Sequence, residues 1–123
     1  MATYKNPLEN ANAILNQERY NRIFEGLKNA GFDTYKDDNN VISAYDDGDA
    51  IREFRVGIGD NDVTFKDLHV DEKYRGQGYG NRLISAVLNS IEPNSDVFVE
   101  NSINDEFWNH IAKKYPNYKW RYK

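Results

Sequence analysis

The sequence predicts an α/β (α+β) fold in which helices flank a mixed, mostly antiparallel sheet. Two observations lead to this prediction. Residues 41–70 hold three runs of strand-forming residues separated by Asp-, Asn- and Gly-rich turns, a pattern typical of an antiparallel meander. Residues 83–122 then alternate between helical and extended patterns, and a helix that crosses between two strands makes them parallel. With 123 residues, of which 39% are hydrophobic, the chain is expected to form one domain, residues 1–123.

The first thirty residues are predicted to form two helices. A short one follows Pro7, where apolar residues recur at helical spacing up to Leu15. A second is indicated over residues 20–27 by a clearer apolar stripe, and Gly31 supplies a C-terminal stop. Three strands of the meander are then expected at residues 41–45, 50–58 and 63–70.

The second half of the chain predicts a helix, a strand, a helix and a short strand. Apolar residues between 83 and 91 line one face of a helix that ends before Pro93, and such a helix must cover a sheet to be stable. Residues 96–100 read as a strand parallel to the one that ends at Val70. The last helix is expected over residues 104–115, and residues 118–122 can pair as a terminal strand.

A glycine-rich turn lies between the strand ending at Val70 and the helix after it. Its glycines stand at alternate positions 76, 78 and 80, where a missing Cβ lets the backbone approach a ligand and several N–H groups point outward at a helix N-terminus. A Walker loop does not fit, because Gly80 is followed by Asn81 rather than by Lys and Ser or Thr. A Rossmann turn does not fit either, because four residues separate Val70 from Arg75, which opens the motif.

The remaining pattern, Arg-x-x-Gly-x-Gly after an apolar strand, resembles the pyrophosphate-binding turn of the GNAT superfamily of acetyl-CoA-dependent N-acetyltransferases. The order of elements resembles the GNAT core over nearly the whole chain, although the family's usual first strand would have to lie within residues 2–5. The resemblance implies a central parallel pair of strands that splays at the cofactor site and pairs its backbone with the pantetheine arm of acetyl-CoA. The residues it implies at the cofactor are Leu68, His69, Val70, Arg75, Gly76, Gln77, Gly78, Tyr79, Gly80, Asn81 and Arg82. Arg82, one turn into the helix, could reach a phosphate or could equally be a solvated surface residue.

The catalytic groups are less clear from the sequence. Positions where many members carry a base on the strand before the motif are occupied here by Lys66 and Thr64. His69 and Asp67 share the other face of that strand, so His69 could relay a proton with Asp67 orienting it, or could simply be a hydrogen-bonded strand histidine. Glu100, at the end of the next strand, is the other candidate base.

The family's usual general acid is a tyrosine on the last helix, in a pattern that starts with asparagine. Counting from Asn101 places Trp108 at the tyrosine position, and counting from Asn104 places Ile111 there. Trp108 and Ile111 at helical spacing are most simply core residues. A coenzyme A thiolate can leave without protonation near neutral pH, so the missing hydroxyl does not exclude catalysis.

Composition limits the function classes further. The chain has no cysteine, which excludes disulfides and cysteine nucleophiles, and its two histidines form no metal-binding pair, so no metal is expected. A net charge of −4 argues against nucleic-acid binding and accommodates a basic partner. The chain has neither an apolar run of membrane-span length nor an apolar leader at its start, so a cytoplasmic protein without membrane contact is expected.

The resemblance thus implies transfer of an acetyl group from acetyl-CoA to a primary amine by direct attack in a ternary complex. The amine is a protein lysine, an N-terminus or a small molecule. The alternative is a weak or inactive GNAT-fold protein, viral or accessory, that binds coenzyme A or a protein partner. The sequence leaves the oligomeric state open, since the strand at residues 118–122 can pair across a dimer or be covered within a monomer.

Overall fold

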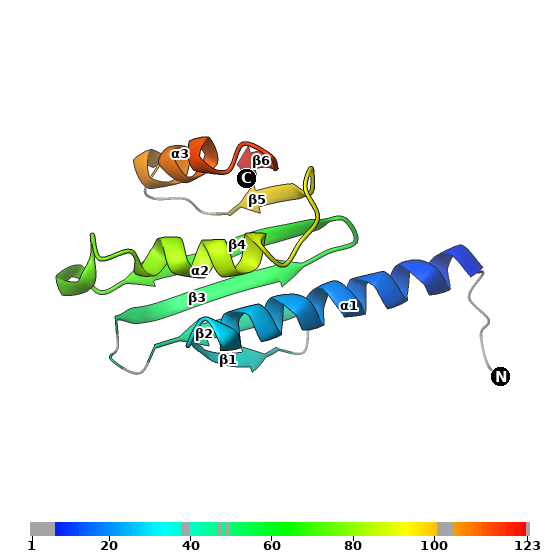
Figure 1. The fold of residues 1–123 in the computed structure, drawn as a ribbon, viewed down its shortest axis with the longest axis horizontal. Coiled ribbons are helices and arrows are strands. Elements are labelled where there is room, and N and C mark those ends of the chain that lie inside the picture. Colours follow the sequence, from blue (N-terminus) through cyan, green and yellow to red (C-terminus); the bar gives the residue numbers. More distant parts are fainter. Residues whose placement is uncertain (1–6, 38–39, 47, 49, 101–104, 123) are drawn as a thin grey trace.

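The computed structural model describes residues 7–37, 40–46, 48, 50–100 and 105–122. Within these residues the chain forms helices, strands and one 3-10 turn, labelled in Figure 1. In chain order they are α1 (Pro7–Asn29), β1 (Asp33–Lys36), β2 (Val41–Tyr45), β3 (Ile51–Ile58), β4 (Asp62–Val70), η1 (Glu72–Tyr74), α2 (Tyr79–Leu88), β5 (Asp96–Val99), α3 (Asp105–Lys114) and β6 (Lys119–Tyr122).

The strands form one mixed sheet in the order β1-β2-β3-β4-β5-β6. Strands β1 to β4 are antiparallel neighbours, as expected for strands joined by short turns. Strands β4, β5 and β6 are parallel, because α2 and α3 cross between them. The predicted fold class, with its mostly antiparallel sheet and central parallel pair, is confirmed.

The three helices lie on the same face of the sheet. A Cβ atom on Gly80 of α2 would stand 3.2 Å from the Phe107 ring of α3 and 3.7 Å from the Leu68 side chain of β4, so both helices cover β4 from one side. Helix α1 packs against α2, where a Cβ on Gly26 would lie 3.1 Å from the Ala86 carbonyl oxygen. Figure 1 shows α1 and α2 in front of the strands. Two right-handed crossovers in the same direction place α2 and α3 on one side.

No helix of the described part covers the other face of the sheet, which we call the open face. Its central row consists of Tyr35, Ser43, Arg55 and Asp67, which are direct cross-strand partners on β1 to β4. Cross-strand partners share a face, and their neighbours along the strands point toward the helices, except Lys66 at a β-bulge. Along this row the open face is polar and at least partly exposed within the described residues.

The core lies between the sheet and the helices. Leu83, Ile84, Val87 and Leu88 of α2 are fully buried, as their helical spacing predicts. They meet the buried face of the sheet, which includes Phe54. Burying one such side chain stabilises the fold by roughly 1.5–3 kcal/mol. These four side chains therefore hold α2 firmly against the sheet.

The prediction of two N-terminal helices was wrong, because α1 is one helix from Pro7 to Asn29. The apolar pattern lapses in its middle because a buried polar side chain, Arg19, takes the inward position and donates to the carbonyl oxygens of Gly59 and Asp60. The helix is therefore continuous through Arg19, although the stripe of apolar residues on its inner face is interrupted there. Its end at Gly31 is confirmed: this residue has φ +96° and donates its N–H to the Lys28 carbonyl oxygen.

The meander has one strand more than predicted. β1 pairs with β2 from Asp33↔Tyr45 to Lys36↔Ile42. Its sequence, Asp-Thr-Tyr-Lys, lacks an apolar face because it lies at the edge of the sheet, where most of its side chains are exposed. The turn residues 38–39 and the proposed first strand at residues 2–5 lie outside the described part of the chain.

Candidate functional site

The parallel pair β4–β5 separates partway along its length. The two strands pair from Asp62↔Asp96 to Phe65↔Val99, and the last bond runs from the Glu100 N–H to the Phe65 carbonyl oxygen at 3.0 Å. Strand β4 continues to pair with β3 on its other side as far as Val70. From residue 66 onward, β4 therefore presents a backbone edge that no described strand covers.

A β-bulge marks the point of separation. Arg55 pairs with Asp67 and Val56 pairs with Phe65, so Lys66 is an extra residue in β4. A bulge increases the local twist of its strand and redirects the residues beyond it. This explains why β4 and β5 diverge here rather than continuing side by side.

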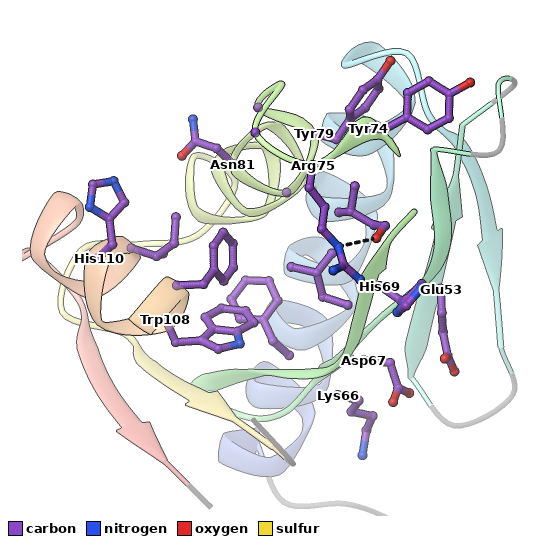
Figure 2. A pocket seen from close by; sticks show the side chains of 18 of the residues that line it. Glu53, Lys66, Asp67, His69, Tyr74, Arg75, Tyr79, Asn81, Trp108 and His110 are labelled. Carbon is purple, nitrogen blue, oxygen red and sulfur yellow. Dashed lines mark hydrogen bonds between the residues drawn. The ribbon is translucent and has the colours of Figure 1, made fainter. Parts of the chain in front are cut away.

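The separation forms one wall of a cleft with a volume of about 900 Å³, shown in Figure 2. That volume suits a cofactor-sized ligand, since small-molecule sites usually span roughly 300–1,000 Å³. Its walls are the open edge of β4, the glycine turn with the start of α2, and α3 with Glu100 at the inner end. Predicted site residues on its walls are Asp67, Leu68, His69, Val70, Arg75, Gly76, Gly78, Tyr79, Gly80, Asn81 and Glu100.

The glycine turn can hold an anion. Gly76 and Gly78 have φ values of +80° and +86°, which favour glycine, and a Cβ atom on either would meet no atom within 4 Å. No side chain caps α2, whose first helical bond runs from the Arg82 N–H to the Gly78 carbonyl oxygen. The N–H groups of residues 79–81 precede that bond and point out of the helix start. A diphosphate group fits this cradle of backbone donors.

A short 3-10 turn, η1, connects β4 to the glycine turn. Asp71 begins it, accepting the Lys73 backbone N–H at 3.3 Å and pairing with the Arg52 Nε at 2.8 Å. The Lys73 N–H is the main cause that lowers the pKa of the Asp71 carboxyl, and Arg52 lowers it further. An ionised Asp71 thus ties the glycine turn to the neighbouring strand β3.

Helix α3 contributes a cation that the sequence did not single out. Lys114 lines the cleft and donates from Nζ to the Asn81 Oδ1 atom at 3.1 Å, close to the start of α2. The Tyr115 hydroxyl donates to the same oxygen at 3.5 Å. His110 lines the cleft one turn earlier. In the sequence Lys114 resembles the solvated face of a helix, and no local signal distinguishes it.

Ionisable side chains gather where the cleft opens to the open face. Glu100 is half-buried, and its Oε2 lies 3.5 Å from the Lys66 Nζ. Asp67 accepts a bond from the Arg55 Nη1 at 3.3 Å. His69 is exposed, and its cross-strand partner is Glu53, which also lines the cleft. Figure 2 shows Glu53, Lys66 and Asp67 on one side of the strands.

The part of the chain that forms both walls of this cleft matches a known family. Residues 37–114 match the family model described as an acetyltransferase (GNAT) domain. The chain belongs to the GNAT acetyltransferases. A comparison with curated proteins and one with solved structures gave no match.

Two of the expected cofactor residues of this GNAT domain are not on the cleft wall. Arg82 turns toward the end of α1, where Nη2 donates to the Ala30 carbonyl oxygen at 2.8 Å and the guanidinium lies 5.0 Å from the Phe32 ring centre. The Gln77 side chain is exposed and donates to the Lys73 carbonyl oxygen. Arg75 does line the cleft, and its Nε donates to the Val70 carbonyl oxygen at 3.1 Å.

The expected pairing of His69 with Asp67 is replaced by contacts across the sheet. Two residues apart on one strand are about 7 Å apart, whereas direct cross-strand partners are about 5 Å apart. Asp67 therefore bonds with Arg55, and His69 stands opposite Glu53. Glu53 was missed because the register between two strands cannot be counted from the sequence.

Trp108, at the position of the family's usual tyrosine, is a core residue as expected. It is buried, with its ring centre 5.4 Å from that of Phe65 and 6.5 Å from that of Trp120. Phe107 packs edge-on against it, and Ile111 is buried one turn further. On the helix side of the sheet, α3 therefore lines the inner end of the GNAT cleft with aromatic rings rather than with a hydroxyl.

We expect a Trp108→Tyr variant to gain less than tenfold in acetyl transfer. The smaller ring would leave a gap beside Phe65, and its hydroxyl would be buried among apolar rings, at a cost of about 1–3 kcal/mol in stability. Steady-state kinetics and thermal melting of both proteins measure the two effects. A gain above tenfold would show that the native site lacks a needed acid.

The described residues contain no group of three or more His, Cys, Asp or Glu side chains placed to hold a metal ion. Among the helices in that same part of the chain, none has the length and apolar character needed to cross a membrane. The cleft is lined by the cationic side chains of Lys66, Arg75 and Lys114 and by the carboxylates of Glu53, Asp67 and Glu100.

Proposed function

We propose that this GNAT domain transfers an acetyl group from acetyl-CoA to a primary amine by direct attack within a ternary complex. The observation that supports this most is the end of β4–β5 pairing at Phe65 and Glu100, which leaves the edge of β4 open along a cleft that leads to the glycine turn. An open strand edge can pair with an extended chain of amides. The pantetheine arm is such a chain.

Binding would use the two ends of the cleft differently. The backbone of Leu68 to Val70 would pair with the pantetheine arm, and the N–H groups between Gly76 and Asn81 would hold the diphosphate, aided by the dipole of α2. Lys114 and the Arg75 guanidinium lie on the cleft walls as cations for the phosphates. Arg75 now bonds to the Val70 carbonyl oxygen, so binding would exchange that bond for one to phosphate.

Acetyl-CoA supplies the activated acetyl thioester, and the chain's residues would prepare the amine. Glu100 stands where β4 and β5 part, and its carboxylate would take the proton from the incoming ammonium group. The neutral amine then forms the N–C bond as the C–S bond breaks and the thiolate leaves, and the amide nitrogen loses its remaining extra proton to the thiolate or to water. Lys66 holds Glu100 in place at 3.5 Å. His69, with Asp67 on the same face, remains the alternative route for the proton.

A coenzyme A-binding protein without turnover is the second candidate function. The buried Trp108 at the usual tyrosine position favours it, because no hydroxyl stands there to protonate the leaving thiolate. Isothermal titration with acetyl-CoA tests binding, and release of free thiol with a panel of primary amines tests transfer. Binding with amine-dependent thiol release is the expected result. Binding without release for any amine would favour the second function, and no binding would reject both.

Replacing Asn81 by Asp is expected to weaken acetyl-CoA binding by about 10- to 30-fold. A carboxylate at this position would repel a diphosphate a few ångströms away, an effect of about 1.4–2 kcal/mol after solvent screening. The fold should be unharmed or stabilised, because the new carboxylate still accepts from Lys114 and lies at a helix N-terminus. Titration calorimetry and thermal melting measure the two quantities.

The matched control is Asn89→Asp at the other end of the same helix, where Asn89 is the C-cap. It adds the same charge far from the glycine turn and should leave the affinity for acetyl-CoA within about twofold. Equal losses of affinity in both variants would contradict the placement of the phosphates at the start of α2.

A further inference from the structure

The open face carries a second hollow in line with the cleft. This hollow has a volume of about 440 Å³ and is lined by residues that include Tyr35, Asp37, Ser43 and Tyr45. The row Tyr35, Ser43, Arg55 and Asp67 runs straight across four strands, with Asp67 on the wall of the cleft and Tyr35 in the hollow. One row of cross-strand partners thus connects the inner end of the cleft to the edge of the sheet.

Around this row the charge is mostly negative, and the other cations that line the cleft, Arg75 and Lys114, lie toward the glycine turn and the start of α2. Four carboxylates, those of Asp37, Glu53, Asp67 and Glu100, line the hollow or the cleft. Two cations stand among them: Arg55 contacts Asp67 at 3.3 Å and Asp37 at 3.9 Å, and Lys66 contacts Glu100. Lys36 also lines the hollow, but its Nζ lies 4.7 Å from the Phe24 ring centre, on the helix side of the sheet.

The hollow has the composition that a cationic side chain prefers. Tyr35 and Tyr45 are exposed at 58% and 36%, and their ring centres are 6.0 Å apart. A lysine or arginine side chain that lies over an exposed aromatic ring gains a cation–π interaction, and Asp37 at the same hollow adds a carboxylate.

We propose that the open face is the acceptor surface, and that the acceptor is a lysine in an extended basic polypeptide segment with a second cationic side chain about four residues away. This inference rests on the proposed acetyl transfer. The lysine to be acetylated would enter the cleft past Asp67, and the second cationic side chain would lie over the exposed rings of Tyr35 and Tyr45. Neighbouring strands are about 4.8 Å apart, so three spacings cover about 14 Å, the length of about four extended residues. The open face, which no described helix encloses, suits a polypeptide rather than an enclosed small amine.

The test measures binding and does not depend on turnover. The probe is a fluorescent Ser/Gly peptide with one lysine and with arginine four residues to either side, and the comparison peptide carries neutral citrulline in place of both arginines. Fluorescence anisotropy with protein saturated with coenzyme A gives the two dissociation constants. We expect the arginine peptide to bind about tenfold more tightly, and a Tyr35→Ala variant to reduce this preference to less than threefold.

Tyr122→Ala is the matched control, because Tyr122 is also exposed on an edge strand, β6, at the opposite side of the sheet. It should keep the full preference. Equal binding of the two peptides by the unmodified protein, or an unchanged preference in Tyr35→Ala, would overturn the proposal. A preference lost equally in both variants would also overturn it, since the effect would then not be local to the hollow.

Thiol release measured on the same samples separates this inference from the proposed function. Transfer to small amines without a preference for arginine peptides would leave acetyl transfer standing and reject the acceptor surface. A preference in binding without thiol release for any amine would keep the surface and reject acetyl transfer.

Discussion

Replacing Glu100 by Gln should lower kcat/KM for amine acetylation by about 100-fold, while the dissociation constant of acetyl-CoA changes less than about twofold. Glutamine keeps the shape of the side chain but cannot take a proton from the ammonium group. The fold should be unaffected, because the bond that anchors this residue runs from its backbone N–H to the Phe65 carbonyl oxygen. Its ion pair with Lys66 is partly exposed and contributes about 0–1 kcal/mol.

The pH dependence of kcat/KM shows whether the Glu100→Gln variant loses activity because the base is missing or because the structure is disturbed. If Glu100 is the base, the acid limb of the kcat/KM profile should disappear in the variant, whereas a structural defect would lower the whole profile evenly. Glu106→Gln, an exposed residue in the first turn of α3, is the control and should behave like the unmodified protein. A full loss in His69→Gln with normal activity in Glu100→Gln would assign the base to His69.

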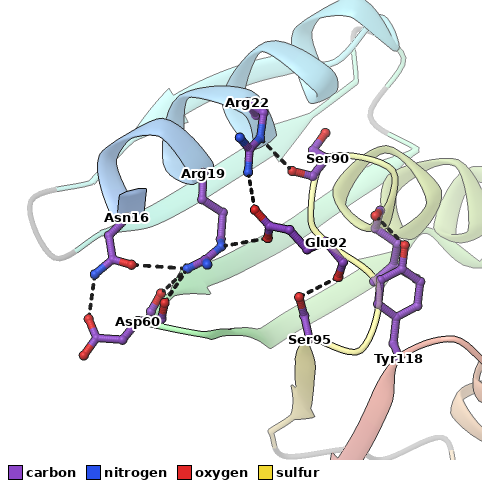
Figure 3. A network of polar contacts seen from close by, with 10 residues as sticks. Asn16, Arg19, Arg22, Asp60, Ser90, Glu92, Ser95 and Tyr118 are labelled. Atoms are coloured by element: carbon purple, nitrogen blue, oxygen red, sulfur yellow. Dashed lines mark hydrogen bonds and ion pairs between the residues drawn. The ribbon is translucent and has the colours of Figure 1, made fainter. Parts of the chain in front are cut away.

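Replacing Arg19 by Met should reduce the free energy of unfolding by about 3 kcal/mol, equivalent to a fall of roughly 10 °C in Tm. Figure 3 shows why: Arg19 reaches from α1 to the turn between β3 and β4 and to the segment after α2. Its Nη1 donates to the carbonyl oxygens of Gly59 and Asp60 at 2.9 and 2.7 Å, and its Nε lies 3.6 Å from a Glu92 carboxylate oxygen. Methionine would fill the space but leave these acceptors without a donor.

Burial makes this arginine different from its neighbour on the helix. The Arg19 side chain is 9% exposed, whereas that of Arg22, which pairs with the same Glu92, is 48% exposed. Arg22→Met is therefore the matched control and should cost less than about 1 kcal/mol. Urea unfolding of both variants measures the difference, and equal losses would show that burial is not the cause.

The Glu92 backbone N–H is the main cause of the lowered pKa of the Glu92 carboxyl, with Arg19 and Arg22 adding to it.

Two exposed apolar residues of α1 show that apolar spacing in a sequence does not always identify the buried face of a helix. Ile14 and Leu15 fit a helical stripe, yet they are 56% and 55% exposed. Arg19 is buried in the same helix, and its Nη1 donates to two carbonyl oxygens of the turn between β3 and β4. In this part of α1, apolar spacing thus indicated that helix was present, but it did not indicate which residues face inward.

The amino-acid sequence by itself determined the fold class, the helix α2 and the glycine turn before it. These signals are local, because a missing Cβ or an apolar residue on every helical turn has its effect within a few positions of the chain. They were sufficient to place the cleft beside Val70 and the start of α2.

Only the tertiary structure decided which charged groups meet in that cleft. The bulge at Lys66, the contact of Asp67 with Arg55 and the approach of Lys114 to Asn81 all join residues from different elements. Strand register controls the first two, and a slip of one residue would turn every side chain to the opposite face of the sheet. The packing of the whole sheet against its helices sets the strand register, so the register cannot be read from any local stretch of sequence.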